Sequence, residues 1–93
     1  MRLRTATGHW IEAPFDAFLE QSELPVLEDA SFPYLRLVDP YADTVFSRLQ
    51  MAAVIPELER LAAAVPSPRI QSVLQLARRC SREDLSYLVF VGD

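Results

Sequence analysis

Few side chains of this sequence suit catalysis, and none has a partner at a spacing that would build a site. His9 is the one histidine, so a multi-histidine metal site cannot form. A histidine next to Cys80 or a serine is the arrangement that nucleophilic catalysis uses. However, His9 adjoins a predicted turn at Gly8, and Cys80 lies near the end of a predicted helix. We therefore interpret His9 as a partly exposed loop residue and predict no catalytic residue.

Cys80 is the one cysteine, which excludes an intramolecular disulfide and fits a reducing compartment. It follows Leu76 by four residues, so it can share the apolar face of a helix and pack as a small hydrophobic side chain. The alternative is a reactive thiol, because Arg78, Arg79 and Arg82 are close enough in sequence to lower its pKa. We favour structural packing.

The sequence lacks the residues and spacings that cofactor and metal sites usually require. The chain has no lysine, which excludes a Schiff base and a P-loop lysine, and its two glycines cannot make a glycine-rich phosphate loop. Two of its many carboxylates could act as an acid and base pair, but any acidic sequence offers such pairs. Glu28 and Asp29 have no regular calcium- or magnesium-loop spacing around them. We predict no cofactor and no metal.

The acidic residues are concentrated in one part of the chain. Residues 12–43 contain eight carboxylates and a single arginine, with aromatic residues between them. Aromatic anchors among carboxylates suit a basic protein partner, because complementary charge speeds encounter and rejects wrong partners. The simpler alternative is a solvated acidic surface over a core of phenylalanines. The predicted partner-binding residues are Trp10, Glu20, Glu23, Glu28, Asp29, Tyr34 and Tyr41.

These carboxylates lead to a test. Charge reversal at Glu20, Glu23, Glu28 and Asp29 is expected to leave the fold intact and to weaken partner binding in a salt-sensitive way.

Arginines gather near the end of the last predicted helix, at positions 78, 79 and 82. Such a cluster can bind phosphate or carboxylate groups in bidentate fashion. More simply, cations in a last helical turn are stabilised by the helix dipole. The cluster could also pair with the acidic residues of a second copy, which would give a homodimer.

The first half of the chain is predicted to contain two strands and one helix. Residues 2–6 alternate as a short strand. Pro14 begins a short amphipathic helix over PFDAFLEQS. Residues 34–38 have strand character, with Leu35 and Leu37 on one side.

The second half is predicted to be mainly helical. Asp39 and Pro40 read as the N-cap and first residue of a helix, which Pro56 should kink or break near residues 53–56. A second stripe ends at Pro66; it comprises Val54, Leu58, Leu61 and Val65. A last helix begins after Ser67, with Ile70, Val73, Leu74 and Ala77 buried.

Residues 86–91 are apolar on both alternating faces, which predicts a strand in the middle of a sheet. The whole chain, residues 1–93, is then a single globular domain of the α+β or α/β class. We expect a small sheet of about three strands packed against two to four helices. A parallel pair between residues 34–38 and 86–91 would need a right-handed crossover.

Composition limits the function. The net charge is −4, which argues against binding to nucleic acid or to an anionic membrane. The absence of lysine and asparagine suggests a GC-rich, bacterial coding sequence, and no apolar run is long enough to span a membrane. We predict a cytoplasmic protein-interaction domain, similar in kind to an inhibitor, immunity protein or adaptor, with a basic partner. The alternative is a small-molecule-binding or enzymatic domain that acts as a homo-oligomer, with Arg36 and Asp39 or Glu12 in a pocket.

Overall fold

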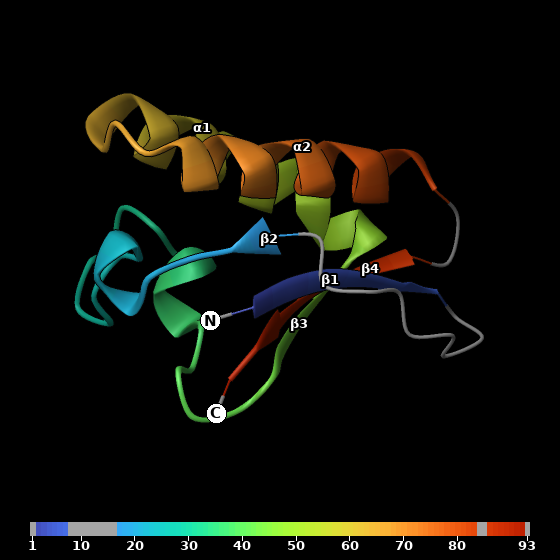
Figure 1. The fold of residues 1–93 in the computed structure, drawn as a ribbon, viewed down its shortest axis with the longest axis horizontal. Helices are drawn as coiled ribbons and strands as arrows, with labels where there is room; N and C mark the ends of the chain where they lie inside the picture. The colour runs from blue at the N-terminus through green and yellow to red at the C-terminus, as the bar shows by residue number, and fades with distance from the viewer. Residues whose placement is uncertain (1, 8–16, 84–85, 93) are drawn as a thin grey trace.

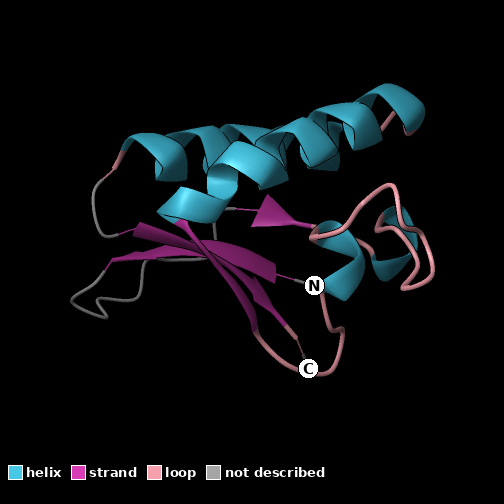
Figure 2. Ribbon diagram, turned by 180° about the vertical axis from the view of Figure 1, so that it is seen from behind, coloured by secondary structure: helices cyan, strands magenta, loops and turns pink. Residues whose placement is uncertain are grey.

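The chain folds as two α-helices packed on one face of an antiparallel sheet (Figure 1). The computed structural model describes residues 2–7, 17–83 and 86–92. The described strands are β1 (Arg2–Thr7), β2 (Ala17–Phe18), β3 (Thr44–Ser47) and β4 (Ser86–Val91), and the helices are α1 (Met51–Ala64) and α2 (Pro68–Arg82). Three short 3-10 turns are η1 (Gln21–Glu23), η2 (Leu35–Leu37) and η3 (Arg48–Gln50) (Figure 2). The α+β class is thus confirmed.

β4 is an inner strand of the sheet, whose order is β2-β1-β4-β3. It is antiparallel to both neighbours, with Leu88 opposite Thr5 on one side and opposite Phe46 on the other. Leu88 and Phe90 are fully buried under the helices, and Val89 on the opposite face is also buried. The prediction of a central apolar strand over residues 86–91 is therefore confirmed.

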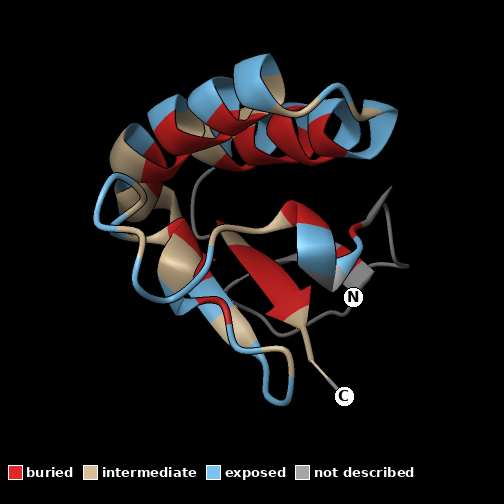
Figure 3. Cartoon of the chain, turned by 90° about the vertical axis from the view of Figure 1, so that its left-hand side faces the viewer, coloured by how far each residue is buried: buried red, intermediate tan, exposed pale blue. Residues whose placement is uncertain are grey.

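Both helices turn an apolar stripe toward the sheet, as the buried surfaces in Figure 3 show. On α2 the predicted stripe is confirmed, and Cys80 continues it at 0% exposure. On α1 the stripe of Val54, Leu58 and Leu61 is buried, and Val65 packs against it. The rings of Phe46 and Phe90 meet edge to face at 5.8 Å in the same core.

The predicted helix over residues 14–22 is wrong where the structure describes it. Residues 8–16 lie outside the described residues, together with His9 and Trp10. Ala17 and Phe18 form β2, which pairs with Leu3 and Arg2. A helix of two turns has little intrinsic stability in water, so pairing with β1 decides the conformation here.

Residues 34–38 form the η2 turn rather than the predicted strand. The amides of Leu37 and Val38 donate to the carbonyls of Tyr34 and Leu35, at 3.0 and 3.2 Å. Burial therefore repeats every three residues: Leu35 and Val38 are buried, whereas Leu37 is 54% exposed. The expectation that Leu35 and Leu37 lie on the same side is therefore wrong.

The predicted helix start at Asp39 and Pro40 is also wrong. The Asp39 carboxylate accepts a hydrogen bond from the Tyr41 amide at 2.8 Å, which makes a local turn instead of a cap. Thr44 to Ser47 then pair with β4, since β-branched and aromatic residues favour a strand. We predicted a kink or a break at Pro56, and α1 continues through it without a break. Pro56 and Ala52 are both exposed, so the carbonyl that loses its donor lies on the solvent side.

No parallel strand pair occurs among the described residues. Two helices, rather than one, connect β3 to β4, so the chain returns to the end where β3 finished and β4 runs antiparallel to it. After β4, the amide of Gly92 donates to the Asp43 carboxylate at 3.2 Å. A Cβ atom on Gly92 would lie 2.3 Å from the carbonyl oxygen of Ala42, so this close approach requires glycine.

Candidate functional site

Residues 19–43 connect β2 to β3 and contain, apart from Trp10, all the predicted partner-binding residues. This segment has two 3-10 turns and no longer element. Side chains from both helices hold it in place. They determine which of its residues face solvent and which are used inside the fold.

Glu57 of α1 binds the start of η2. Its carboxylate is 2% exposed and accepts hydrogen bonds from the Tyr34 amide at 3.1 Å and the Leu35 amide at 3.0 Å. The sequence analysis missed this residue. The signal was present, because Glu57 lies three residues after Val54 and beside Leu58, on the stripe that was predicted to be buried.

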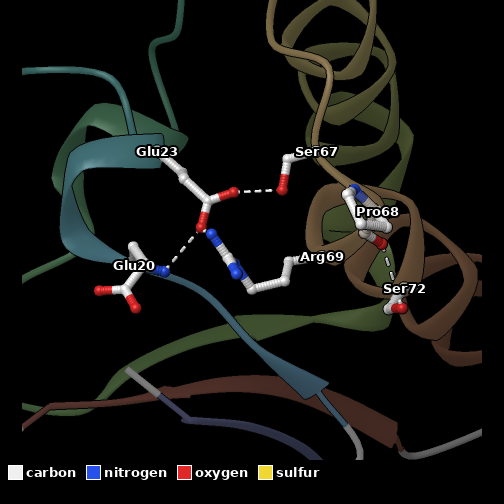
Figure 4. Close-up of polar contacts among 6 residues, drawn as sticks. All are labelled: Glu20, Glu23, Ser67, Pro68, Arg69 and Ser72. Atoms are coloured by element: carbon white, nitrogen blue, oxygen red, sulfur yellow. Dashed lines mark hydrogen bonds and ion pairs between the residues drawn. The ribbon is translucent and has the colours of Figure 1, made fainter.

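Glu23 of η1 binds the beginning of α2 (Figure 4). Its carboxylate accepts hydrogen bonds from the Ser67 hydroxyl, from Arg69 Nε at 2.7 Å and from the Glu20 amide at 2.9 Å. Burial by itself raises the pKa of Glu23, but the hydrogen bonds from Ser67 and Glu20 and the charge of Arg69 hold it below its ordinary value. Glu23 was predicted to face a partner; it is only 9% exposed and is bound within the chain.

Glu23 is expected to make the domain lose stability in acid. Because its folded pKa lies below the ordinary value of 4.5, its contribution is fully present above that value and is lost as the pH falls through the folded pKa. A Glu23→Gln variant cannot carry this charge. It should be less stable than the natural chain at neutral pH, and the difference should shrink at about pH 3. Urea denaturation at both pH values measures this.

Glu59→Gln is the control for that comparison, since Glu59 is half exposed and its ion pair with Arg78 is long, at 3.6 Å. It should change stability little at either pH. A Glu23→Gln deficit of the same size at both pH values would contradict the tether described above. The same tether corrects the expectation that charge reversal at Glu23 leaves the fold intact.

Arg60 and Asp29 fix the middle of the segment. Arg60 donates to the Ser31 carbonyl at 2.5 Å, and its guanidinium lies 5.3 Å from the centre of the Phe32 ring. The Ser31 hydroxyl and amide both donate to Asp29, which lowers the pKa of that carboxyl. Asp29 is therefore also part of a local turn.

Between these attachments the segment forms an apolar groove of about 460 Å³, here called the 24–40 groove. Three side chains of its wall are unusually exposed for their type: Val26 at 66%, Leu27 at 61% and Leu37 at 54%. Arg36 Nε is buried in the same wall and has no hydrogen-bond partner in the structure. The groove is lined by Leu24, Pro25, Val26, Leu27, Arg36, Leu37, Val38, Asp39 and Pro40.

Carboxylates and one aromatic residue adjoin the groove. Asp39 belongs to its lining, and Glu28 is exposed directly after Leu27. Glu20 is also exposed, but it lies before η1 and outside the lining. Tyr41 follows Pro40 and is 80% exposed. Tyr34 is half-buried, because its ring packs edge to face on Phe46 at 6.1 Å. Of the predicted residues, the structure thus leaves Glu20, Glu28 and Tyr41 open to solvent and uses Glu23 internally.

The other residues considered for chemistry are Cys80, which is buried, and the arginines near it, which form ion pairs within the chain. Burial raises the pKa of the Cys80 thiol, which is the opposite of the activation by arginines considered above. Arg78 and Arg79 pair with Glu59 and Glu83 at 3.6 and 3.9 Å. Among the described residues, no three histidine, cysteine, aspartate or glutamate side chains are grouped to hold a metal ion.

Comparisons with protein-family models, with curated proteins and with solved structures find no match for this chain. Neither of the two described α-helices has the length and apolar composition that crossing a membrane requires.

Proposed function

We propose that the chain is a protein-interaction domain, of the inhibitor, immunity-protein or adaptor kind, that binds a segment of another protein in the 24–40 groove. The observation that carries the proposal is the exposure of Val26, Leu27 and Leu37 around one groove. Contiguous exposed apolar side chains on a small soluble domain are typical of an interaction site.

The chemistry of the partner follows from the charges beside the groove. Glu28 and Asp39 give this part of the surface a negative character, and Arg36 is the one basic residue of the 19–43 segment. A segment with an apolar side chain next to lysine or arginine fits both properties. Arg36 Nε is buried and has no acceptor among the described residues, so a bound segment that draws this side chain outward can supply a backbone carbonyl as its acceptor.

The groove is held in place before any partner arrives. Glu57 fixes η2, which carries Arg36 and Leu37, and Glu23 fixes η1, which precedes Leu24. A preformed site binds more tightly than a flexible one, because less conformational entropy is lost on binding.

A small-molecule site is the second candidate. The alternative given in the sequence analysis places Arg36 and Asp39 in one pocket, and both line this groove. A small ligand would use the guanidinium and the carboxylate inside the groove. It would leave Val26 and Leu27 at 66% and 61% exposure without a role, so the exposed wall favours a protein partner.

The test is selection of a displayed random-peptide library on the purified natural chain. The enriched peptides should combine an apolar side chain with lysine or arginine, and their binding should weaken with salt. Leu37→Glu should weaken that binding by at least about tenfold, since a central apolar contact typically contributes more than 1 kcal/mol. Fluorescence anisotropy with the enriched peptides measures this.

Leu49→Glu is the matched control, because it places the same charge at another exposed leucine outside the groove. It should bind the peptides as the natural chain does. Enriched peptides without basic residues, or equal binding by Leu37→Glu, would overturn the proposal. Competition by small carboxylates or amines, with no peptide enriched, would favour the small-molecule alternative.

A further inference from the structure

Tyr41 lies next to the 24–40 groove and contributes little to the core. It directly follows Pro40, which lines the groove, and it is 80% exposed. Tyr34, by contrast, packs its ring on Phe46 inside the fold. A tyrosine that the core does not use is a frequent anchor of a protein interface, because its ring offers a large contact area with few rotatable bonds.

The loop that carries Tyr41 is fixed at both ends. The Asp39 amide donates to Thr44 Oγ1 at 3.0 Å, and the Tyr41 amide donates to the Asp39 carboxylate at 2.8 Å. At the other end the Asp43 carboxylate accepts from the Gly92 amide at 3.2 Å, where the chain leaves β4 (Figure 1). The backbone at Tyr41 therefore loses little entropy when a partner binds.

Asp39 connects the groove to this tyrosine. It belongs to the groove lining, and its Oδ1 atom accepts the hydrogen bond from the Tyr41 amide. No arginine in the described part of the chain forms an ion pair with Asp39. Because Asp39 is exposed, its Oδ2 atom can accept hydrogen bonds from a ligand.

The arginine of the groove, Arg36, acts on a different carboxylate. Hydrogen bonds from Ser31 lower the pKa of Asp29, and the charge of Arg36 adds to that effect. A negative charge therefore remains at the Pro40 end of the groove, beside the exposed ring of Tyr41. This end of the groove combines an aromatic ring with a carboxylate.

We propose that an arginine of the partner segment binds at Tyr41 and Asp39, while a neighbouring apolar side chain of that segment enters the 24–40 groove. This inference rests on the proposed function, because it gives the basic residue of the same segment its place. A guanidinium can stack on an aromatic ring and donate to a carboxylate at the same time, whereas a lysine ammonium is a compact, strongly hydrated charge. The site therefore selects arginine over lysine.

Fluorescence anisotropy with the peptides enriched on the natural chain tests this assignment. Arginine should predominate over lysine among them. Tyr41→Leu should weaken the binding of an arginine peptide at least about fivefold, and Tyr41→Phe less than about twofold, because the ring rather than the hydroxyl makes the contact. A peptide with citrulline in place of arginine keeps the shape without the charge. It should bind more weakly to the natural chain, and Tyr41→Leu should then cause no further loss.

Leu49→Ala is the control, since it truncates a side chain that is 77% exposed and lies outside the groove lining. It should bind the peptides as the natural chain does, and circular dichroism melting should show that all variants are folded.

The outcomes separate this proposal from the proposed function. Peptides rich in lysine, equal binding by Tyr41→Leu, or separate additive losses from citrulline and Tyr41→Leu would overturn the arginine site. The groove itself would stand if Leu37→Glu still weakened binding. Equal binding by Leu37→Glu, or the enrichment of no peptide, would overturn both.

Discussion

The Glu57→Ala variant should lose about 3 kcal/mol of its free energy of unfolding, because two backbone amides lose their acceptor within the fold. Glu57 is 2% exposed, and its carboxylate accepts from the amides of Tyr34 and Leu35. Leu35 is itself fully buried, so water cannot readily replace the lost acceptor. In a domain of this size such a loss lowers the Tm by more than about 10 °C. Calorimetry measures it.

Glu59→Ala is the matched control for Glu57→Ala. Both remove a glutamate from α1, but Glu59 is half exposed and its ion pair with Arg78 is long, at 3.6 Å. Its removal should change stability by less than about 0.5 kcal/mol. Hydrogen exchange should also separate the two, since only Glu57→Ala exposes the Tyr34 and Leu35 amides. Equal melting of the two variants would show that the buried carboxylate does not hold η2.

An element could be predicted from the sequence where its buried residues follow one regular spacing along the chain. The stripe on α2 repeats at helical spacing after Ser67 and Pro68, and every predicted member of it is buried. Residues 86–91 are apolar in a run too short for a helix, and they form β4 with the predicted bounds. In both cases neighbouring residues along the chain carry the whole signal.

Elements that depend on distant partners could not be predicted. Residues 34–38 have the alternation of a strand, but Glu57, more than 20 positions later, binds the Tyr34 and Leu35 amides and supports a 3-10 turn. β2 exists because β1 pairs with it, and β3 because β4 does. Local propensity is weak beside such tertiary contacts.

The candidate site shows the same division. The excess of carboxylates in residues 12–43 directed attention to this segment, but charge alone could not separate Glu23, which is bound to Ser67 and Arg69, from Glu28, which is exposed. The groove is built by apolar residues that the sequence presents as an ordinary loop. Leu37 in particular was expected to share a side with Leu35, and only the turn geometry of η2 places it at the surface.

Deletion of residues 86–93 should abolish folding altogether. β4 pairs along its whole length with β1 and also with β3, so its removal leaves no described pairing between β3 and the other strands. Leu88 and Phe90 are fully buried, and Phe90 contacts the Phe46 ring. A chain of this size has a stability of only about 5–15 kcal/mol, whereas the loss of a single buried phenylalanine side chain costs about 3–5 kcal/mol. The truncated chain should therefore show no cooperative thermal transition by circular dichroism.

Complementation distinguishes loss of this strand from general damage to the chain. A synthetic peptide of residues 86–93 added to the truncated chain should restore a cooperative transition, because it can occupy the place between β1 and β3. The same peptide with Phe90→Asp should fail, since a charge would then enter the core beside Phe46. A truncated chain that melts cooperatively without peptide would show that the helices and the remaining strands form a core without β4. That result would remove the physical basis for the sheet order described above.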